Sequence, residues 1–338
     1  MAETVIICGN PKSGTTLLQA LLDWHDSLFV VPTELKYFKY VNFPHLPPGN
    51  FVHEEMGNGI PIPSVNPPSN EQIIKYISSV RDLGNLISGK LRARNINVDE
   101  GIDIEELNKS LDEVGEYGEK KKLYRELLSS IKSSVKRYKN KNVTIVEKTP
   151  HYEEFAQEID CWFDNVLFIH VMRNPYANIH SVRKNDMLVR SLRETYKMTA
   201  KSYYFMERNK RYIDKYKVIR FEDLVLDTEN VIREVADYIG ISFSKSLLRP
   251  TILGKPWGGN SNTQSSDFTG IDPRPVSAFE GNMHPFDKAV INRFFSPILK
   301  KYDYKLRPIS NWKAWLPAGW EHPVSYVRNR YLLFDDYL

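Results

Sequence analysis

The chain has 338 residues, of which 41% are hydrophobic and 26% charged, and its formal net charge is +4. This composition excludes an intrinsically disordered chain, and so small and dispersed a positive excess does not indicate nucleic-acid binding. Cys8 and Cys161 fall in no metal-binding or disulfide pattern and are both expected to be buried. Neither a signal peptide nor an apolar run long enough for a membrane span is present, so we expect a cytoplasmic protein.

A buried strand, a tight loop and an amphipathic helix are predicted in succession at the N-terminus. Residues 4–8 (TVIIC) form a short apolar run, and leucines recur at helical spacing from Thr15 onward. Further strands are predicted at 143–147, 165–172 and 217–221, and helices at about 120–138, 152–159, 175–184, 191–214 and 228–239. Strands that alternate with helices predict an α/β fold of three layers, with a mainly parallel central sheet flanked by helices, as in P-loop NTPases.

Long irregular segments interrupt this alternation. Residues 42–68 contain seven prolines, and charged helical stretches follow them to about residue 138. We therefore interpret 42–140 as a proline-rich loop and a largely helical insertion between the first and second strands. Residues 254–275 predict a second long loop. The remaining assignments are a single domain over 1–310 and an aromatic C-terminal tail over 311–338.

The loop after the first strand, GNPKSGTT (9–16), has the glycine spacing of a phosphate-binding P-loop. Gly9 and Gly14 keep that spacing, but Thr15 stands where an ATP-binding loop has its lysine. The strands at 143–147 and 165–172 lead into EKTP and MRNP rather than into an aspartate that could hold magnesium. We therefore expect phosphate binding without a metal. The expected anion ligands are the backbone N–H groups of Gly14, Thr15 and Thr16 and the hydroxyls of Ser13, Thr15 and Thr16.

Two further segments match one family when they are taken together with this loop. VMRNPYANIHS (171–181) ends a strand at Arg173 and places Ser181 eight residues later. An arginine fork and a hydroxyl suit a phosphate dianion. VIRFEDLVLDTENVIREVADYIGI (218–241) reads as a strand, a loop and a helix that ends at a glycine. All three resemble motifs of the sulfotransferases that use 3′-phosphoadenosine 5′-phosphosulfate (PAPS), over residues 4–40 and 143–310.

This resemblance implies roles for particular residues of the segments. In the family, the loop with Lys12 holds the 5′-phosphosulfate, and the arginine and serine that match Arg173 and Ser181 hold the 3′-phosphate. In the segment at 218–241, Glu222 and Asp223 are expected to fix the loop rather than to act in catalysis.

The resemblance also implies sulfonate transfer to an acceptor hydroxyl, less readily to an amine, by a metal-free in-line reaction. EKTPHY (147–152) is closer to the bacterial and carbohydrate sulfotransferases than to the cytosolic small-molecule branch. The expected base is therefore Glu34, with His151 as the alternative. Lys12 would neutralise charge on the leaving oxygen. Lys148 is expected to stabilise the transferred group, to pair with a carboxylate, Glu34 or Glu147, or to do both.

The remaining expectations concern the nucleotide and the acceptor. Candidate nucleotide contacts in the late loop are Trp257, Asn260 and Ser261, and the product would be 3′,5′-adenosine bisphosphate. The acceptor is expected to be a small molecule, a glycan or a lipid-linked molecule with a free hydroxyl, bound on the side of the insertion at 42–140. No nucleic acid is expected as a partner. The alternatives are a non-catalytic nucleotide- or anion-binding module and a divergent P-loop kinase, which would need a lysine at position 15 and a magnesium ligand.

Overall fold

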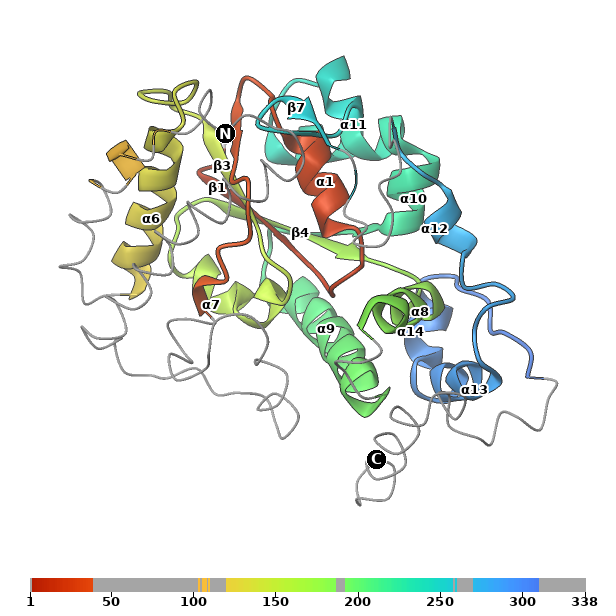
Figure 1. The fold of residues 1–338 in the computed structure, drawn as a ribbon. Helices are drawn as coiled ribbons and strands as arrows, with labels where there is room; N and C mark the ends of the chain where they lie inside the picture. Colours follow the sequence, from red (N-terminus) through yellow and green to blue (C-terminus); the bar gives the residue numbers. More distant parts are fainter. Residues whose placement is uncertain are drawn as a thin grey trace.

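The centre of the protein is a parallel sheet. A computed structural model describes residues 2–38, 103, 105–107, 109, 120–186, 192–257, 259 and 270–309. Within them the five-stranded sheet has the order β2-β3-β1-β4-β5, and all its neighbours pair in parallel (Figure 1). The strands are β1 (Thr4–Cys8), β2 (Leu28–Val30), β3 (Thr144–Lys148), β4 (Val166–Met172) and β5 (Tyr216–Arg220).

Helices cover both faces of the sheet, which confirms the predicted three-layer α/β fold (Figure 1). One face carries α1 (Thr15–Leu22), α10 (Phe221–Leu226) and α11 (Thr228–Ile239). The other face carries α6 (Lys120–Ser134), α7 (Ala156–Asp160), α8 (Pro175–Asp186) and α9 (Leu192–Tyr212). The smaller elements are η2 (Tyr152–Glu154), η3 (Lys245–Leu248), the hairpin β6 (Thr251–Ile252) and β7 (Lys255–Pro256), α12 (Arg274–Ser277), α13 (Pro285–Phe294) and α14 (Ser296–Lys301).

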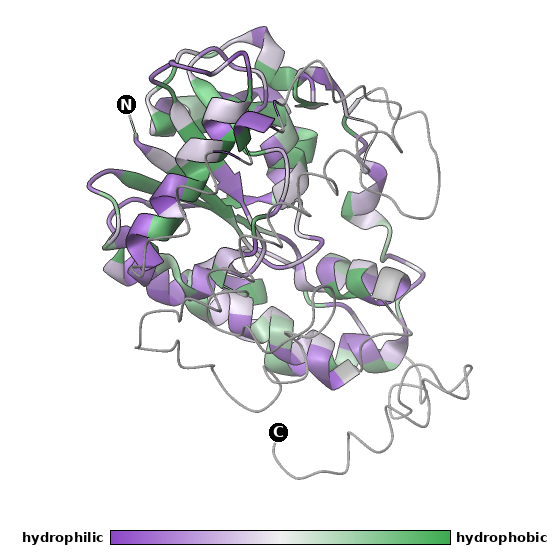
Figure 2. Cartoon of the chain, turned by 60° about the vertical axis from the view of Figure 1, so that its left-hand side comes forward, coloured by the Kyte–Doolittle hydropathy of each residue, from purple (hydrophilic) through white to green (hydrophobic). Residues whose placement is uncertain are grey.

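Alternate side chains of the central strands enter two separate hydrophobic cores. In β1, Ile6 and Cys8 belong to the core under α6 and α9, whereas Val5 and Ile7 belong to the core under α1 and α11. A strand that is buried on both faces needs a nearly continuous apolar run, which explains the sequence TVIIC. Figure 2 shows the strands largely in hydrophobic green, while the helices carry both green and purple residues, as amphipathic helices do.

Several boundaries differ from the prediction. The short strand β2 precedes the insertion, so the insertion follows the second strand instead of separating the first from the second. The helix predicted at 152–159 is a short 3₁₀ turn, η2, followed by α7, and the predicted loop at 254–275 contains β7 and the first residues of α12. Cys8 is buried as expected, but Cys161 is exposed.

The predicted insertion and tail are described only in part. Helix α6 lies inside the predicted insertion and packs Tyr124, Leu127 and Ile131 against the sheet. Most of residues 42–119 and all of the tail at 311–338 lie outside the described residues, so these assignments stay predictions. Among the helices that the structure describes, none is long and apolar enough to cross a membrane.

The topology places one loop at the centre of the sheet's carboxyl edge. Strand β1 lies between β3 and β4, and the chain passes from β1 toward β2 on one side before it crosses to β4 and β5 on the other. In open parallel sheets, ligands bind at such a switch point, beyond the carboxyl ends of the strands. The loop at 9–14, which follows β1, lies at this point.

Candidate functional site

The two glycines of the loop at 9–14 are required by its geometry. Both have left-handed backbone conformations, with φ of 137° at Gly9 and 103° at Gly14. A Cβ atom at Gly9 would lie 2.5 Å from the carbonyl oxygen of Val171, and one at Gly14 would lie 2.3 Å from the ring of Phe221. Only glycine combines this conformation with so little space, so the P-loop spacing has a structural cause here.

The start of α1 is arranged to receive an anion. The helix begins at Thr15 with Gly14 as its N-cap and has no acidic residue in its first turn. The first N–H groups of a helix have no partner within it and carry partial positive charge. Beside them, the hydroxyl of Ser13 is buried and has no hydrogen-bond partner within the described part of the chain. A buried, unsatisfied hydroxyl next to a helix start fits a bound phosphate group.

Glu34 and Lys148 meet beside the start of α1. The Nζ atom of Lys148 lies 2.6 Å from Oε1 of Glu34 and 3.2 Å from the hydroxyl oxygen of Thr16. The Lys148 side chain is 3% exposed and that of Glu34 is 31% exposed, so the carboxylate lies at the accessible end of the pair. Lys36 approaches the other carboxylate oxygen of Glu34 at 3.8 Å. Of the two carboxylates expected as partners of Lys148, Glu34 is the one in a salt bridge with it.

His151, the alternative base, belongs to a different network. It precedes η2 in a left-handed conformation with φ of 70°, and its backbone N–H donates to the Gly9 carbonyl at 3.4 Å. Its ring Nδ1 lies 3.7 Å from a carboxylate oxygen of Glu154, which also pairs with Lys201 of α9 at 2.6 Å. His151 is therefore tied to the α9 side of the loop, and Glu34 to the α1 side.

Arg173, at the end of β4, contacts the loop at 9–14 directly. Its Nη1 donates to the Lys12 carbonyl at 2.7 Å, and its Nη2 donates to the Pro275 carbonyl in α12 at 2.6 Å. The guanidinium lies 4.5 Å from the ring centre of Phe221, and burial lowers the pKa of Arg173 to about 10. Its buried Nε has no hydrogen-bond partner among the described residues. The structure thus brings the predicted 3′-phosphate motif to the predicted 5′-phosphosulfate loop.

The other predicted nucleotide contacts are less fully defined. Ser181 is partly buried in the second turn of α8. Trp257 follows β7, and its backbone N–H donates to the Pro250 carbonyl at 3.0 Å. The buried indole Nε1 of Trp257 has no hydrogen-bond partner in the described ranges. Asn260 and Ser261 lie outside the described residues.

The predicted segment at 218–241 fastens the strand ends to each other. The carboxylate of Glu222 accepts hydrogen bonds from the Asn174 backbone N–H at 2.9 Å and from the Tyr304 hydroxyl at 2.8 Å. Glu222 and Asp223 lie in the first turn of α10 rather than in a loop, because the chain turns into a helix directly after β5. Gly240 ends α11 with φ of 83°, as the sequence predicts.

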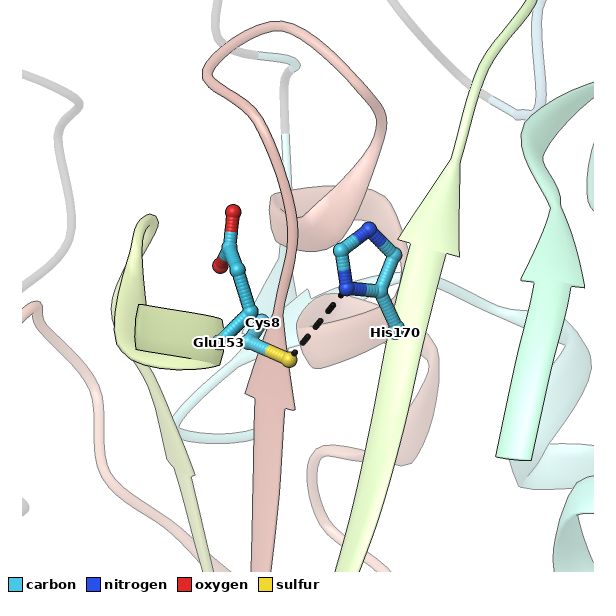
Figure 3. Close-up of side chains that lie close together, drawn as sticks. All are labelled: Cys8, Glu153 and His170. Atoms are coloured by element: carbon cyan, nitrogen blue, oxygen red, sulfur yellow. Dashed lines mark hydrogen bonds between the residues drawn. The ribbon is translucent and has the colours of Figure 1, made fainter. Parts of the chain in front are cut away.

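A buried polar cluster beneath the loop was missed by the sequence analysis. Cys8, Glu153 and His170 come from β1, η2 and β4, and each offers a possible metal-ligand atom within 4.8 Å of the others (Figure 3). The Cys8 sulfur lies 3.7 Å from Nδ1 of His170, and that nitrogen lies 2.9 Å from the Tyr216 hydroxyl. Burial lowers the pKa of His170 to about 3, so the ring is neutral at physiological pH.

The hydrogen bonds of Glu153 show what this cluster does. Its carboxylate accepts the Gly9 backbone N–H at 3.1 Å and the hydroxyl of Ser202 in α9. Because these oxygens already have partners within the protein, we interpret the cluster as a network that fastens the loop to η2 and α9. The ionisable His170 inside the apolar run VLFIHVM was the signal that could have revealed it, since such a residue needs a buried partner.

The fold and the loop together define an α/β protein of the P-loop type. Comparison with protein families identifies it further: the model of the sulfotransferase family matches residues 4–245, most of the chain, which therefore belongs to this family of transferases. Among curated proteins, a sequence search finds no match.

Solved structures with similar folds are also sulfotransferase domains. The domain from the Synechococcus PCC 7002 olefin synthase is 20% identical, with a TM-score of 0.56 over 90% of this chain and 95% of that one. The domain from the curacin biosynthetic pathway is 20% identical, with a TM-score of 0.55 over 91% of this chain and 99% of that one. At such identities the likeness supports the fold.

Proposed function

We propose that this sulfotransferase moves the sulfonate group of PAPS to an acceptor hydroxyl, less readily to an amine, with Glu34 as the general base. The observation that carries the proposal is the cluster of Glu34, Lys148 and Thr16 at the carboxyl edge of the sheet. It combines a partly exposed carboxylate, a buried ammonium and the start of the helix that follows the phosphate loop.

The donor nucleotide would be held by two groups of residues. The 5′-phosphosulfate fits the start of α1, where Lys12, the buried Ser13 hydroxyl, Thr15 and Thr16 surround the helix N-terminus. The 3′-phosphate would be bound by Arg173 and Ser181, and the unsatisfied Nε of Arg173 supports this assignment. PAPS supplies an activated sulfonate, and the residues of this chain orient it.

The transfer needs a base and two positive charges. As the acceptor oxygen bonds to sulfur, its proton passes to the Glu34 carboxylate, and the bond between sulfur and the phosphate oxygen breaks. Lys148 would stabilise charge on the transferred sulfonate, which its bonds to Glu34 and Thr16 support, and Lys12 would neutralise the leaving phosphate oxygen. The accessible position of Glu34 supports its choice over His151, whose ring faces Glu154.

Two measurements test this function. Calorimetry should show that 3′,5′-adenosine bisphosphate binds equally well with and without EDTA, and that it binds more tightly than ATP. Transfer of ³⁵S from labelled PAPS should then be measured to para-nitrophenol, octanol, N-acetylglucosamine and water. We expect transfer to at least one hydroxyl acceptor.

The outcomes separate the proposal from its alternatives. ATP preferred over the bisphosphate, with a magnesium requirement, would support a kinase. Bisphosphate binding without release or transfer of ³⁵S would support a non-catalytic module. The variant Lys12→Met should abolish transfer, and Lys300→Met, at an exposed lysine of α14, serves as its matched control.

A further inference from the structure

The backbone that follows Glu34 is held by side chains at the end of β3. The Leu35 backbone lies close enough to the buried carboxylate of Glu147 to lower its pKa. The next N–H group, that of Lys36, donates to the hydroxyl oxygen of Thr149 at 3.4 Å. Successive backbone groups on the C-terminal side of Glu34 are therefore tied to this one strand end.

Glu147 is the centre of this attachment. The side chain is 0% exposed, and its oxygens accept the Thr149 hydroxyl at 2.7 Å and the hydroxyl of Tyr124 in α6 at 3.2 Å. Successive residues of a strand point to opposite faces, so Glu147 faces α6 while Lys148 faces Thr16 in α1. The segment with Glu34 is thus held at the strand end from both faces of the sheet.

The surroundings of Glu147 make its charge sensitive to pH. The titratable groups that interact with it are Tyr124 of α6, Cys8 of β1 and the adjacent Lys148. Burial raises the pKa of Glu147 to about 7, and the hydrogen bond from Thr149 opposes this shift. A protonated carboxyl group keeps less acceptor capacity than a carboxylate, so protonation weakens its hold on the donors around it.

We propose that Glu147 is a positioning residue that, together with Thr149, holds the backbone after Glu34 and so keeps the Glu34 carboxylate beside Lys148. The inference rests on the proposed function, in which Glu34 is the base. Glu147 acts through the main chain, because its oxygens are buried among Thr149, Tyr124 and the Leu35 backbone.

The variant Glu147→Gln tests this role through the pH dependence of kcat. Glutamine resembles the protonated form of Glu147, so above pH 7 we expect kcat to fall roughly 10- to 100-fold, as for a base displaced by a fraction of an ångström. Below pH 7 the rate of the unmodified enzyme should converge on that of the variant. The KM for PAPS should be unchanged. The assay uses ³⁵S transfer to whichever acceptor of the panel above the unmodified enzyme sulfates fastest.

Further variants separate positioning from a loss of folding. Thr149→Val should also lower kcat, and Thr149→Ser, which keeps the hydroxyl, should restore it. The matched control is Asp23→Asn, because the buried Asp23 carboxylate also accepts a hydroxyl and a backbone N–H, from Thr251 at 2.6 Å and Gly254 at 2.9 Å. Asp23 lies at the other end of α1 from Thr16. The kcat of Asp23→Asn relative to that of the unmodified enzyme should therefore not depend on pH.

Hydrogen exchange of the peptide at 31–38 supplies a readout that does not depend on activity. Exchange there should accelerate in Glu147→Gln and Thr149→Val but not in Asp23→Asn. The role of Glu147 would be overturned if the ratio of kcat between Glu147→Gln and the unmodified enzyme stayed constant with pH. Unchanged exchange at 31–38 would overturn it as well. Neither result would bear on the sulfotransferase activity itself. If the unmodified protein transfers no sulfonate, the proposed function itself fails, and the inference fails with it.

Discussion

At the scale of single residues, Gly14 combines two constraints that can be separated by mutation. Its φ of 103° is a left-handed conformation, and a Cβ atom would collide with the ring of Phe221. Gly240 shares the first constraint, with φ of 83°, but a Cβ atom there would meet nothing within 4 Å among the described residues. Both the backbone conformation and the lack of space therefore restrict Gly14, whereas only the backbone conformation restricts Gly240.

Gly14→Ala should accordingly destabilise the protein more than Gly240→Ala. We expect a left-handed alanine at either position to lower the free energy of unfolding by roughly 1–2 kcal/mol. In Gly14→Ala, overpacking against Phe221 should lower the free energy of unfolding by roughly 1–3 kcal/mol more. Urea unfolding measures the difference, and calorimetry should show weaker bisphosphate binding only in Gly14→Ala. Equal destabilisation of the two variants would contradict this account of the loop.

Glu34→Gln tests the base in isolation from the donor site. The glutamine keeps the shape of the side chain but cannot accept the acceptor's proton, so kcat should fall roughly 10²- to 10⁴-fold. Affinity for the bisphosphate should change little, because that product lacks the transferred sulfonate. Asp26→Asn is the control, since the Asp26 side chain is 89% exposed and pairs with Arg137. An unshifted rate in Glu34→Gln would remove Glu34 from the mechanism and favour His151 as the base.

At the scale of elements, Arg173 joins three parts of the chain. One guanidinium donates to the carbonyl of Lys12 in the phosphate loop and to that of Pro275 in α12, and it stands at the end of β4. Since both acceptors are backbone carbonyls, the planar fork of arginine fixes the paths of two separate segments. The arginine of the predicted 3′-phosphate motif therefore has a structural role in this fold.

Arg173→Lys should loosen both of these segments together. A lysine cannot reproduce the fork, and each lost charge-assisted hydrogen bond contributes roughly 1.5–3 kcal/mol, so bisphosphate affinity should fall at least about 10-fold. Amide exchange should accelerate in the peptides at 9–14 and 270–277. Arg233→Lys, at an exposed pair with Glu229 in α11, should change neither. Faster exchange in one peptide alone would show that the two segments are not coupled through Arg173.

Most strands of the central sheet could be predicted from the sequence, but one strand and the contact between Glu34 and Lys148 could not. Strands β1 and β4 were found because each is a nearly continuous apolar run, and β3 and β5 because shorter apolar stretches alternate there with helical patterns. Helix α11 was found because its cap glycine is explicit. Strand β2 was missed because three residues, LFV, carry no periodicity. The pairing of Glu34 with Lys148 could only be left open, since it depends on how a loop crosses a strand end 114 residues away.

At the scale of the whole molecule, the site depends on buried polar groups that local patterns do not reveal. The motifs identified the loop, Arg173 and Lys148, but they did not reveal how the buried carboxylates near them are bonded. Glu153 accepts the Gly9 backbone N–H of the loop, and Glu147 accepts the hydroxyls of Tyr124 and Thr149. Both are 0% exposed, and burial raises the pKa of each to about 7. Burying carboxylates in this way opposes folding, so the organisation of the site lowers the stability of the molecule as a whole.

This cost makes the free energy of unfolding depend on pH in a defined direction. The pKa of Glu153 rises from 4.5 to about 7 on folding, mainly through burial, so the folded state holds a proton that the unfolded state releases. The contribution of Glu153 to stability is therefore greatest below pH 4.5 and is lost as pH rises toward about 7. The slope approaches roughly 1.4 kcal/mol for each pH unit within that window.

Glu153→Gln should remove this dependence, because the amide does not titrate. Its free energy of unfolding relative to the unmodified protein should therefore increase between pH 4.5 and about 7 and stay constant above. Urea unfolding at several pH values measures the difference, with Glu229→Gln, at the exposed pair with Arg233 in α11, as the control for a glutamate on the surface. A difference that is constant with pH would show that the Gly9 and Ser202 hydrogen bonds offset the burial of Glu153, and one that increases toward acid would show that they outweigh it. Either result would contradict a raised pKa for Glu153.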